Sequence, residues 1–164
     1  VTYHQAQELC AKRNMRLPTH DEWYKAAVGT PDGAGKVCNL DSGTLSETGV
    51  YSKCQSPSGA HDMIGNVWEW VDASAEDGVY NDRVLPDTGF VIDADGAGVA
   101  LRTNMVDAGN FHSDYFWSSD TGSFGMIRGG FYGSESDGGL YSIQSQVERS
   151  FSGIAVGFRC VKDL

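Results

Sequence analysis

The sequence predicts one domain with two short helices near its N-terminus, followed by short strands joined by long loops. Two stretches before residue 30 have the residues that begin helices, whereas the glycines, 21 of 164 residues, favour turns and loops. The length and a hydrophobic content of 40% are typical of a single globular domain with a sizeable core. We find no internal repeat or interdomain linker in residues 1–164.

Both predicted helices begin with a capping box, in which a Thr and a Gln or Glu three residues later bond each other's backbone amides. Thr2 and Gln5 begin the first helix, which we expect to end at about Asn14. Thr19 and Glu22 begin the second helix, and its apolar side chains share one side, at Trp23, Ala26 and Ala27.

Two long segments are predicted to be loops. Residues 33–59 are rich in Gly, Ser, Thr and Asn, and residues 72–110 are similar, with strands expected only at 90–92 and 99–101. The sequence Asp93-Ala94-Asp95-Gly96 matches the start of an EF-hand loop. Because Asn104 stands where that loop needs a bidentate acid, we expect a plain turn.

The charge balance excludes two classes of partner. Asp and Glu number 22 against 12 Lys and Arg, for a net charge of −10, so nucleic acid and anionic membrane surfaces are poor partners. No apolar run is long enough to insert into a membrane, and no signal peptide is visible. The chain begins at Val1, directly before a helix, which leaves open that it is a processed product.

Four cysteines allow three disulfide pairings. Cys38 and Cys54 bracket a loop with little core of its own, and Cys10 and Cys160 could join the two ends of the chain. The alternative is four buried thiols that pack as small apolar side chains. We expect disulfides, and with them an oxidising compartment.

The stretch from Asp62 to Trp70 has two interpretations. Asp62 and Glu69 flank a glycine-containing turn and are oxygen ligands of the kind that Ca²⁺ prefers. Alternatively, the two acids belong to turns or ion pairs while Trp68 and Trp70 lie in the core. Spacing alone favours the second interpretation.

Residues 128–160 are framed by Arg128-Gly129-Gly130 and Gly157-Phe158-Arg159-Cys160. Between the frames the chain is rich in Ser and Gly, contains several aromatics, and has no Cys, His or Lys. Neither helical nor strict alternating periodicity is present. This content favours a recognition surface over a reaction centre.

Four motifs stand in a fixed order, and together they resemble one family: Arg16-Leu17-Pro18-Thr19-x-x-Glu22-Trp23, Asp62-Met63-x-Gly65-Asn66-Val67-Trp68-Glu69-Trp70, Arg128-Gly129-Gly130 and Gly157-Phe158-Arg159. The sequence resembles the formylglycine-generating-enzyme (sulfatase-modifying factor) domain, a subtype of the C-type lectin fold. The resemblance implies an α+β fold with two helices, small antiparallel sheets and much irregular loop. The strands that usually precede the first helix in that family are missing.

This resemblance implies a structural Ca²⁺ site but no catalysis. The implied ligands are the side chains of Asp62 and Glu69 and the carbonyls of Gly65 and Val67. The enzymes of the family use two copper-binding cysteines that lie between the motifs equivalent to Arg128-Gly129-Gly130 and Gly157-Phe158-Arg159. This chain has no cysteine there. Without thiolates there is no soft site for Cu(I), so we expect a protein that is not an enzyme.

A closer resemblance is to the variable proteins of diversity-generating retroelements, of the archaeal or phage type, which use this fold to bind ligands. In those proteins the template sequence between the two framing motifs is rich in Asn, and it has the same number of residues as the segment between the frames of this chain. Where the template has Asn, most residues of this chain can arise by replacing one or both adenines of the Asn codon. Gln144 and Gln146 cannot arise in that way. With Tyr132, the implied ligand-binding positions are Phe131, Gly133, Ser134, Asp137, Val147, Phe151, Gly153 and Ala155.

The implied partner is a protein or glycan on a host or neighbouring cell, met from an extracellular, cell or virion surface. Phe131, Tyr132 and Phe151 are the expected anchors, since aromatic side chains supply contact area at low entropic cost. Residues 112–117 either extend this surface or form an edge strand that packs Phe116 on the core.

Two other functions stay open. The first is an oxidative enzyme of the formylglycine type with unrecognised ligands, although the four histidines show no metal-binding spacing. The second is a calcium-dependent glycan-binding lectin, although the Glu-Pro-Asn sugar motif of C-type lectins is absent.

Overall fold

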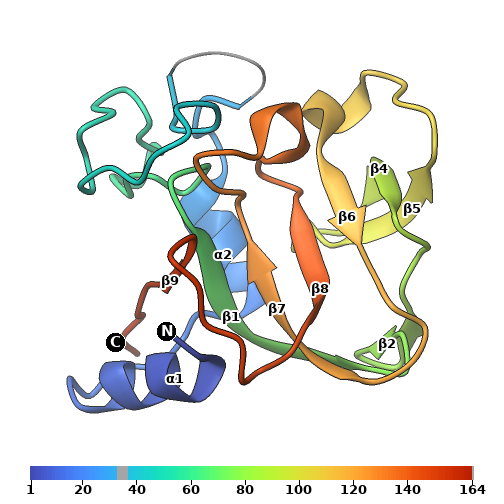
Figure 1. Ribbon diagram of the computed structural model, residues 1–164, viewed down its shortest axis with the longest axis horizontal. Helices are drawn as coiled ribbons and strands as arrows, with labels where there is room; N and C mark the ends of the chain where they lie inside the picture. The colour runs from blue at the N-terminus through green and yellow to red at the C-terminus, as the bar shows by residue number, and fades with distance from the viewer. Residues whose placement is uncertain (33–36, 164) are drawn as a thin grey trace.

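The computed structural model describes residues 1–32 and 37–163 (Figure 1). Both helices lie in the first 30 residues, at α1 (Tyr3–Ala11) and α2 (His20–Ala27). The strands and 3-10 turns follow in the order β1 (Trp68–Glu76), β2 (Val79–Tyr80), β3 (Arg83–Val84), β4 (Gly89–Ala94), β5 (Ala100–Asn104), η1 (Asn110–Ser113), β6 (Tyr115–Trp117), β7 (Ser123–Arg128), η2 (Glu135–Asp137), β8 (Ile143–Val147) and β9 (Val156–Phe158).

All the strands belong to one sheet. Its order is β3-β2-β1-β7-β8-β6-β4-β5, and β9 adds to β1 off this path. The pairs β1–β9 and β6–β8 are parallel and the remaining pairs are antiparallel. The expected fold class is confirmed, but the sheet is larger than expected and is mixed.

The expectation of a loop from residue 72 onward was wrong, because β1 continues to Glu76 and β2 and β3 follow it. The first four residues of β1 are all buried, and exposure begins only at Asp72, so an alternating pattern is absent where the strand starts. Polar Asp72 is held inside the strand region by the Tyr3 hydroxyl, which donates to its Oδ1 at 2.7 Å. The strands predicted at 90–92 and 99–101 are present as the longer hairpin β4–β5.

Both capping boxes are confirmed. Helix α1 ends at Ala11 instead of near Asn14, because Asn14 has a φ of 54° and the Met15 amide turns back to the Cys10 carbonyl. In the second box the Glu22 carboxylate accepts from the Thr19 amide at 2.9 Å.

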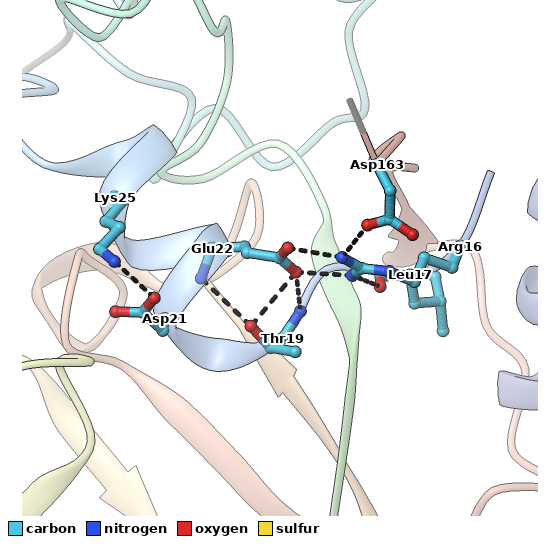
Figure 2. A network of polar contacts seen from close by, with 7 residues as sticks. All are labelled: Arg16, Leu17, Thr19, Asp21, Glu22, Lys25 and Asp163. Atoms are coloured by element: carbon cyan, nitrogen blue, oxygen red, sulfur yellow. Dashed lines mark hydrogen bonds and ion pairs between the residues drawn. The ribbon is translucent and has the colours of Figure 1, made fainter.

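Glu22 also joins α2 to the C-terminal segment (Figure 2). Arg16 donates to both carboxylate oxygens of Glu22, at 2.7 and 2.6 Å, and to Asp163 at 2.6 Å. The bonds from Arg16 and from the Thr19 amide hold the pKa of Glu22 at about 2, well below its usual range. Figure 2 also shows the exposed pair Lys25–Asp21, at 2.7 Å, on the outer side of α2.

Two groups of buried side chains form the core. One lies between α2 and the sheet, with Trp23, Ile64 and Phe116 fully buried. The other lies under α1, where Tyr3, Ala6 and Cys10 of the helix pack with Leu17, Trp68, Trp70, Ile127 and Val156. The loop 37–59 contributes to the first group through its cysteines and Leu40.

Two disulfides close the structure. Cys10 pairs with Cys160 and Cys38 pairs with Cys54, the two pairings expected from the sequence, with sequence separations of 150 and 16 residues. The first joins α1 to the segment after β9, near both chain ends in Figure 1. The second fixes the loop before β1, whose initial residues 33–36 lie outside the described part.

We predict that the two disulfides stabilise the fold unequally. Loop-closure entropy gives about 5 kcal/mol for the long bridge and about 3 kcal/mol for the short one, so replacing Cys10 and Cys160 by Ser should lower the free energy of unfolding more than replacing Cys38 and Cys54. Urea unfolding of the two double variants measures this order. A larger loss for Cys38→Ser/Cys54→Ser would contradict it.

Candidate functional site

An open groove of about 720 Å³ is lined by side chains of β1, β7 and β8 and of the chain that connects β8 to β9. Figure 1 shows these strands next to one another, with β7 between β1 and β8. The groove has a size in the range of sites that hold small molecules or single side chains of a partner. It is lined by Trp68, Ile127, Phe131, Gln144, Gln146, Val147, Glu148, Ser150, Phe151, Ser152, Ala155 and Val156.

The groove has a rigid apolar floor and an aromatic wall. Trp68, Ile127 and Val156 are 5%, 2% and 8% exposed, because the same side chains belong to the core under α1. Phe131 is half-buried against that core, and Phe151 is 49% exposed. The floor is therefore fixed by the fold, while the wall is open to solvent.

The structure divides the nine positions that the sequence predicts for ligand binding. Four of them line the groove. A fifth, Gly153, is next to the groove residue Phe151, because a Cβ on Gly153 would lie 3.2 Å from the Phe151 ring. The other four lie in the turn that leads into η2 or within η2 itself. None of the nine is buried. The groove members are Phe131, Val147, Phe151 and Ala155, and the turn members are Tyr132, Gly133, Ser134 and Asp137.

Sequence reasoning missed the polar residues of the groove. Gln144, Gln146, Glu148, Ser150 and Ser152 line it but were not among the predicted binding residues. Strand β8 carries the missing signal, since Ile143 and Ser145 are buried whereas the residues between and after them are not. Recognising this alternation would have placed both glutamines on the open side.

Arg128 fixes the base of the site and is itself fully buried. Its guanidinium lies 4.6 Å from the Trp23 ring and donates to the carbonyls of Ala97, Gly98 and Leu140, at 2.8, 3.1 and 3.0 Å. Burial lowers the pKa of Arg128 to about 9. The side chain therefore joins α2, the β4–β5 turn and the segment before β8, and it is out of reach of a ligand.

His20 lies beside Arg128 and is buried, not at the surface. Arg128 Nη1 donates to His20 Nδ1 at 3.2 Å, which places the imidazole proton on Nε2. Burial first, and then the charges of Arg128 and Arg83, keep the pKa of His20 well below its usual value. The imidazole is thus a neutral core group at physiological pH.

Residues 112–117 belong to the frame and do not line the groove. Strand β6 lies between β8 and β4, so it is an inner strand instead of the edge strand considered above, and Phe116 is fully buried. Phe111, His112 and Ser113 precede it with left-handed φ values of 49°, 59° and 69°. Such residues cost about 1–2 kcal/mol each, so packing must hold the turn in place.

Asp114 holds this turn against the segment before β8. Its Oδ2 accepts from the Tyr141 amide at 2.6 Å, and the Tyr141 ring packs on Phe111 with centroids 4.7 Å apart. Asp114 Oδ1 is buried without a partner among the described residues. Burial, followed by the nearby charge of Asp32, raises the pKa of Asp114 well above its usual value.

The expected calcium ligands lie close to one another but have other partners. Asp62, Val67 and Glu69 line a second pocket of about 340 Å³, which Gly65 does not line. Arg159 donates to both oxygens of Glu69 at 2.6 Å, and the Trp23 indole donates to Glu69 Oε2 at 2.8 Å. Asp62 Oδ2 accepts from the Gly49 amide at 2.7 Å, while its Oδ1 is buried without a partner among the described residues.

These residues fit a hard cation in part. The unpartnered Asp62 oxygen points to a missing partner, and oxygen ligands suit Ca²⁺. Arg159 already neutralises Glu69, which leaves Asp62 as the one carboxylate of the pair with charge to offer.

All four cysteines are in disulfides, so none is available as a thiolate for copper or for attack on a substrate. Within residues 1–32 and 37–163 no group of three or more His, Cys, Asp or Glu side chains could hold a metal ion. In the same ranges, no helix has the length and apolar character needed to cross a bilayer.

We predict that Asp114→Asn makes stability less dependent on pH. Because the folded-state pKa of Asp114 is above the unfolded value, its contribution is fully present below the unfolded pKa and is lost as pH rises through the folded pKa. In that window the wild type should lose up to about 1.4 kcal/mol per pH unit relative to the Asn variant. Urea unfolding of both proteins between pH 4 and pH 8 tests this, and parallel curves would contradict it.

Comparison with known proteins agrees with this architecture. The chain is 30% identical over 118 residues to the bovine (Bos taurus) protein named inactive C-alpha-formylglycine-generating enzyme 2, covering 59% of this chain and 39% of that protein. It is 27% identical over 152 residues to a hercynine oxygenase of Mycolicibacterium thermoresistibile, covering 84% of this chain and 29% of that protein. This chain therefore spans well under half the length of these relatives.

Solved structures of the Major Tropism Determinant U1 and P3c variants share the fold. Their TM-scores are 0.64 and 0.63 at 18% identity, and each match covers 99% of this chain and 37% of the other. The model of the sulfatase-modifying factor enzyme 1-like domain matches residues 1–164. The chain therefore belongs to the family of sulfatase-modifying factor enzyme 1-like domains, and its fold is the C-type lectin fold in the formylglycine-generating-enzyme subtype.

Proposed function

We propose that this chain is a non-enzymatic ligand-binding domain whose residues between 128 and 160 are diversified by a retroelement. The observation that carries the proposal is that the nine positions expected to vary are all partly or fully exposed, with none of them buried. Buried residues lie among them: Arg128 is fully buried, and Ile143 and Ser145 of β8 are buried on either side of the partly exposed Gln144.

Two of the positions proposed to vary are joined to the rest of the fold by backbone hydrogen bonds. The Tyr132 amide donates to the Asn66 carbonyl at 3.2 Å, and the Tyr132 carbonyl accepts from the Gly43 amide at 3.0 Å. The Ala155 carbonyl accepts from the Trp68 amide at 2.9 Å. Because these bonds do not use side chains, the residues can change while the chain path is kept. This supports a surface that tolerates diversification.

The comparisons support a binding role over catalysis. A relative is named inactive, and the proteins that share the fold are named tropism determinants and occur as several variants. Hercynine oxygenases keep an oxidative enzyme as the alternative, although the groove has no cysteine or histidine for such chemistry. The partner would be a protein or glycan, and the two disulfides favour an extracellular or virion-surface location.

The DNA downstream of the gene tests the proposal. We expect a near-repeat of codons 128–160 that differs mainly at adenines, beside a reading frame for a reverse transcriptase. A locus with no such repeat would remove the case for diversification. Turnover of a cysteine-containing peptide or of hercynine by the purified protein would favour the enzyme instead.

We predict that variable positions tolerate substitution where their neighbours do not. Phe151→Ser and Ala155→Ser should each change the free energy of unfolding by less than about 1 kcal/mol, because their side chains are not part of the core. Val156→Ser, adjacent in sequence but 8% exposed, should cost about 2–3 kcal/mol. Urea unfolding compares the three variants, and an equal loss in all of them would contradict the separation of face and core.

We also propose a weak structural Ca²⁺ site at Asp62, Val67 and Glu69. With a dissociation constant of about 10⁻⁴–10⁻³ M, about 5 mM Ca²⁺ should stabilise the protein by about 1–2 kcal/mol. Thermal melting in Ca²⁺ and in EDTA measures the effect. Asp62→Asn should abolish it and exposed Asp41→Asn should keep it, whereas identical melting in both buffers for the wild type would exclude the site.

A further inference from the structure

The groove combines an apolar interior with negative charge at its rim. None of its twelve lining residues is Lys, Arg or His, and Glu148 is the one charged member. Glu148 is exposed and is bonded by the Ser150 hydroxyl at 3.2 Å, so no cation within the groove neutralises it. The nearest basic residue in sequence, Arg149, turns away to Glu76 at 3.1 Å and to the Tyr3 ring at 5.9 Å.

The interior of the groove suits a carbon side chain better than a sugar. Seven lining residues are apolar, and they include the aliphatic side chains of Ile127, Val147, Ala155 and Val156, which cannot bond hydroxyls. The amides of Gln144 and Gln146 stand on the open side of β8, where they can bond the backbone of a bound chain.

We infer that the groove binds a protein segment in which an aromatic or large aliphatic side chain is flanked by Lys or Arg. The apolar side chain occupies the groove above Trp68, and a flanking basic residue faces Glu148. Electrostatic complementarity of this kind contributes to partner choice and to the rate of association. The inference rests on the proposed function, because it names the chemical class of ligand that the groove of this particular sequence binds.

Three capped pentapeptides test the inference: Gly-Lys-Phe-Lys-Gly, Gly-Glu-Phe-Glu-Gly and Gly-Lys-Ser-Lys-Gly. NMR titration of the intact protein follows the Trp68 indole N–H and the side-chain amides of Gln144 and Gln146. We expect the Lys-Phe peptide to shift these signals with a dissociation constant at least about three-fold lower than that of the Glu-Phe peptide at low salt. The Lys-Ser peptide should leave the Trp68 signal in place.

Two variants serve as a matched pair in this titration. Glu148→Gln should reduce the difference between the Lys-Phe and Glu-Phe peptides, and Glu8→Gln, an exposed acid on α1, should keep it. Equal or tighter binding of the Glu-Phe peptide would overturn the inference. So would an unmoved Trp68 signal with all three peptides, or a shift produced by a neutral methyl glycoside alone. In each case a downstream repeat beside a reverse-transcriptase frame would leave the proposed function standing.

Discussion

A single buried cation holds together the parts of the molecule that carry the surface proposed to vary. The Arg128 guanidinium donates to carbonyls from the β4–β5 turn and from the segment before β8, with its charge over the Trp23 ring. No carboxylate contacts it directly in the described chain, so peptide dipoles and an aromatic face replace the lost water. The surrounding chain has to fit closely: a Cβ on Gly98, whose φ is 68°, would lie 2.4 Å from the Tyr24 ring. The sheet, α2 and the variable segment consequently share one anchor.

This anchor also fixes where the segment proposed to vary begins. Arg128 ends β7, and that segment begins three residues later at Phe131, directly after the glycines of the same motif. Gly129, at a φ of 93°, leaves no room for a side chain, because a Cβ there would lie 2.6 Å from the Met63 carbonyl oxygen. The path of the chain is thus decided before the first variable residue, and the backbone bonds of Tyr132 and Ala155 maintain it afterwards.

The sequence was sufficient for features that depend on local chemistry. Both capping boxes followed from short motifs, since a Thr three residues before a Gln or Glu has few other uses at a helix start. The fold class followed from four motifs that resemble one family, and the disulfide pairings from the positions of four cysteines along the chain. Features that depend on distant pairing did not follow. Asp72 and Ser74 made β1 look like a loop, because their tolerance in a strand comes from Tyr3 and from a bulge against β7. The polar lining of the groove was missed for a different reason, because the small polar Ser145 occupies a buried position of β8 and hides the alternation that exposes Gln144 and Gln146.

The Cys10–Cys160 bridge has a mechanical consequence. It joins positions close to the two ends of the chain, which lie near each other in Figure 1. Tension applied through residues 1 and 163 would pass across this covalent link and would not load the sheet between them. A domain that attaches one body to another while both are moving would keep its contact face intact under such a pull.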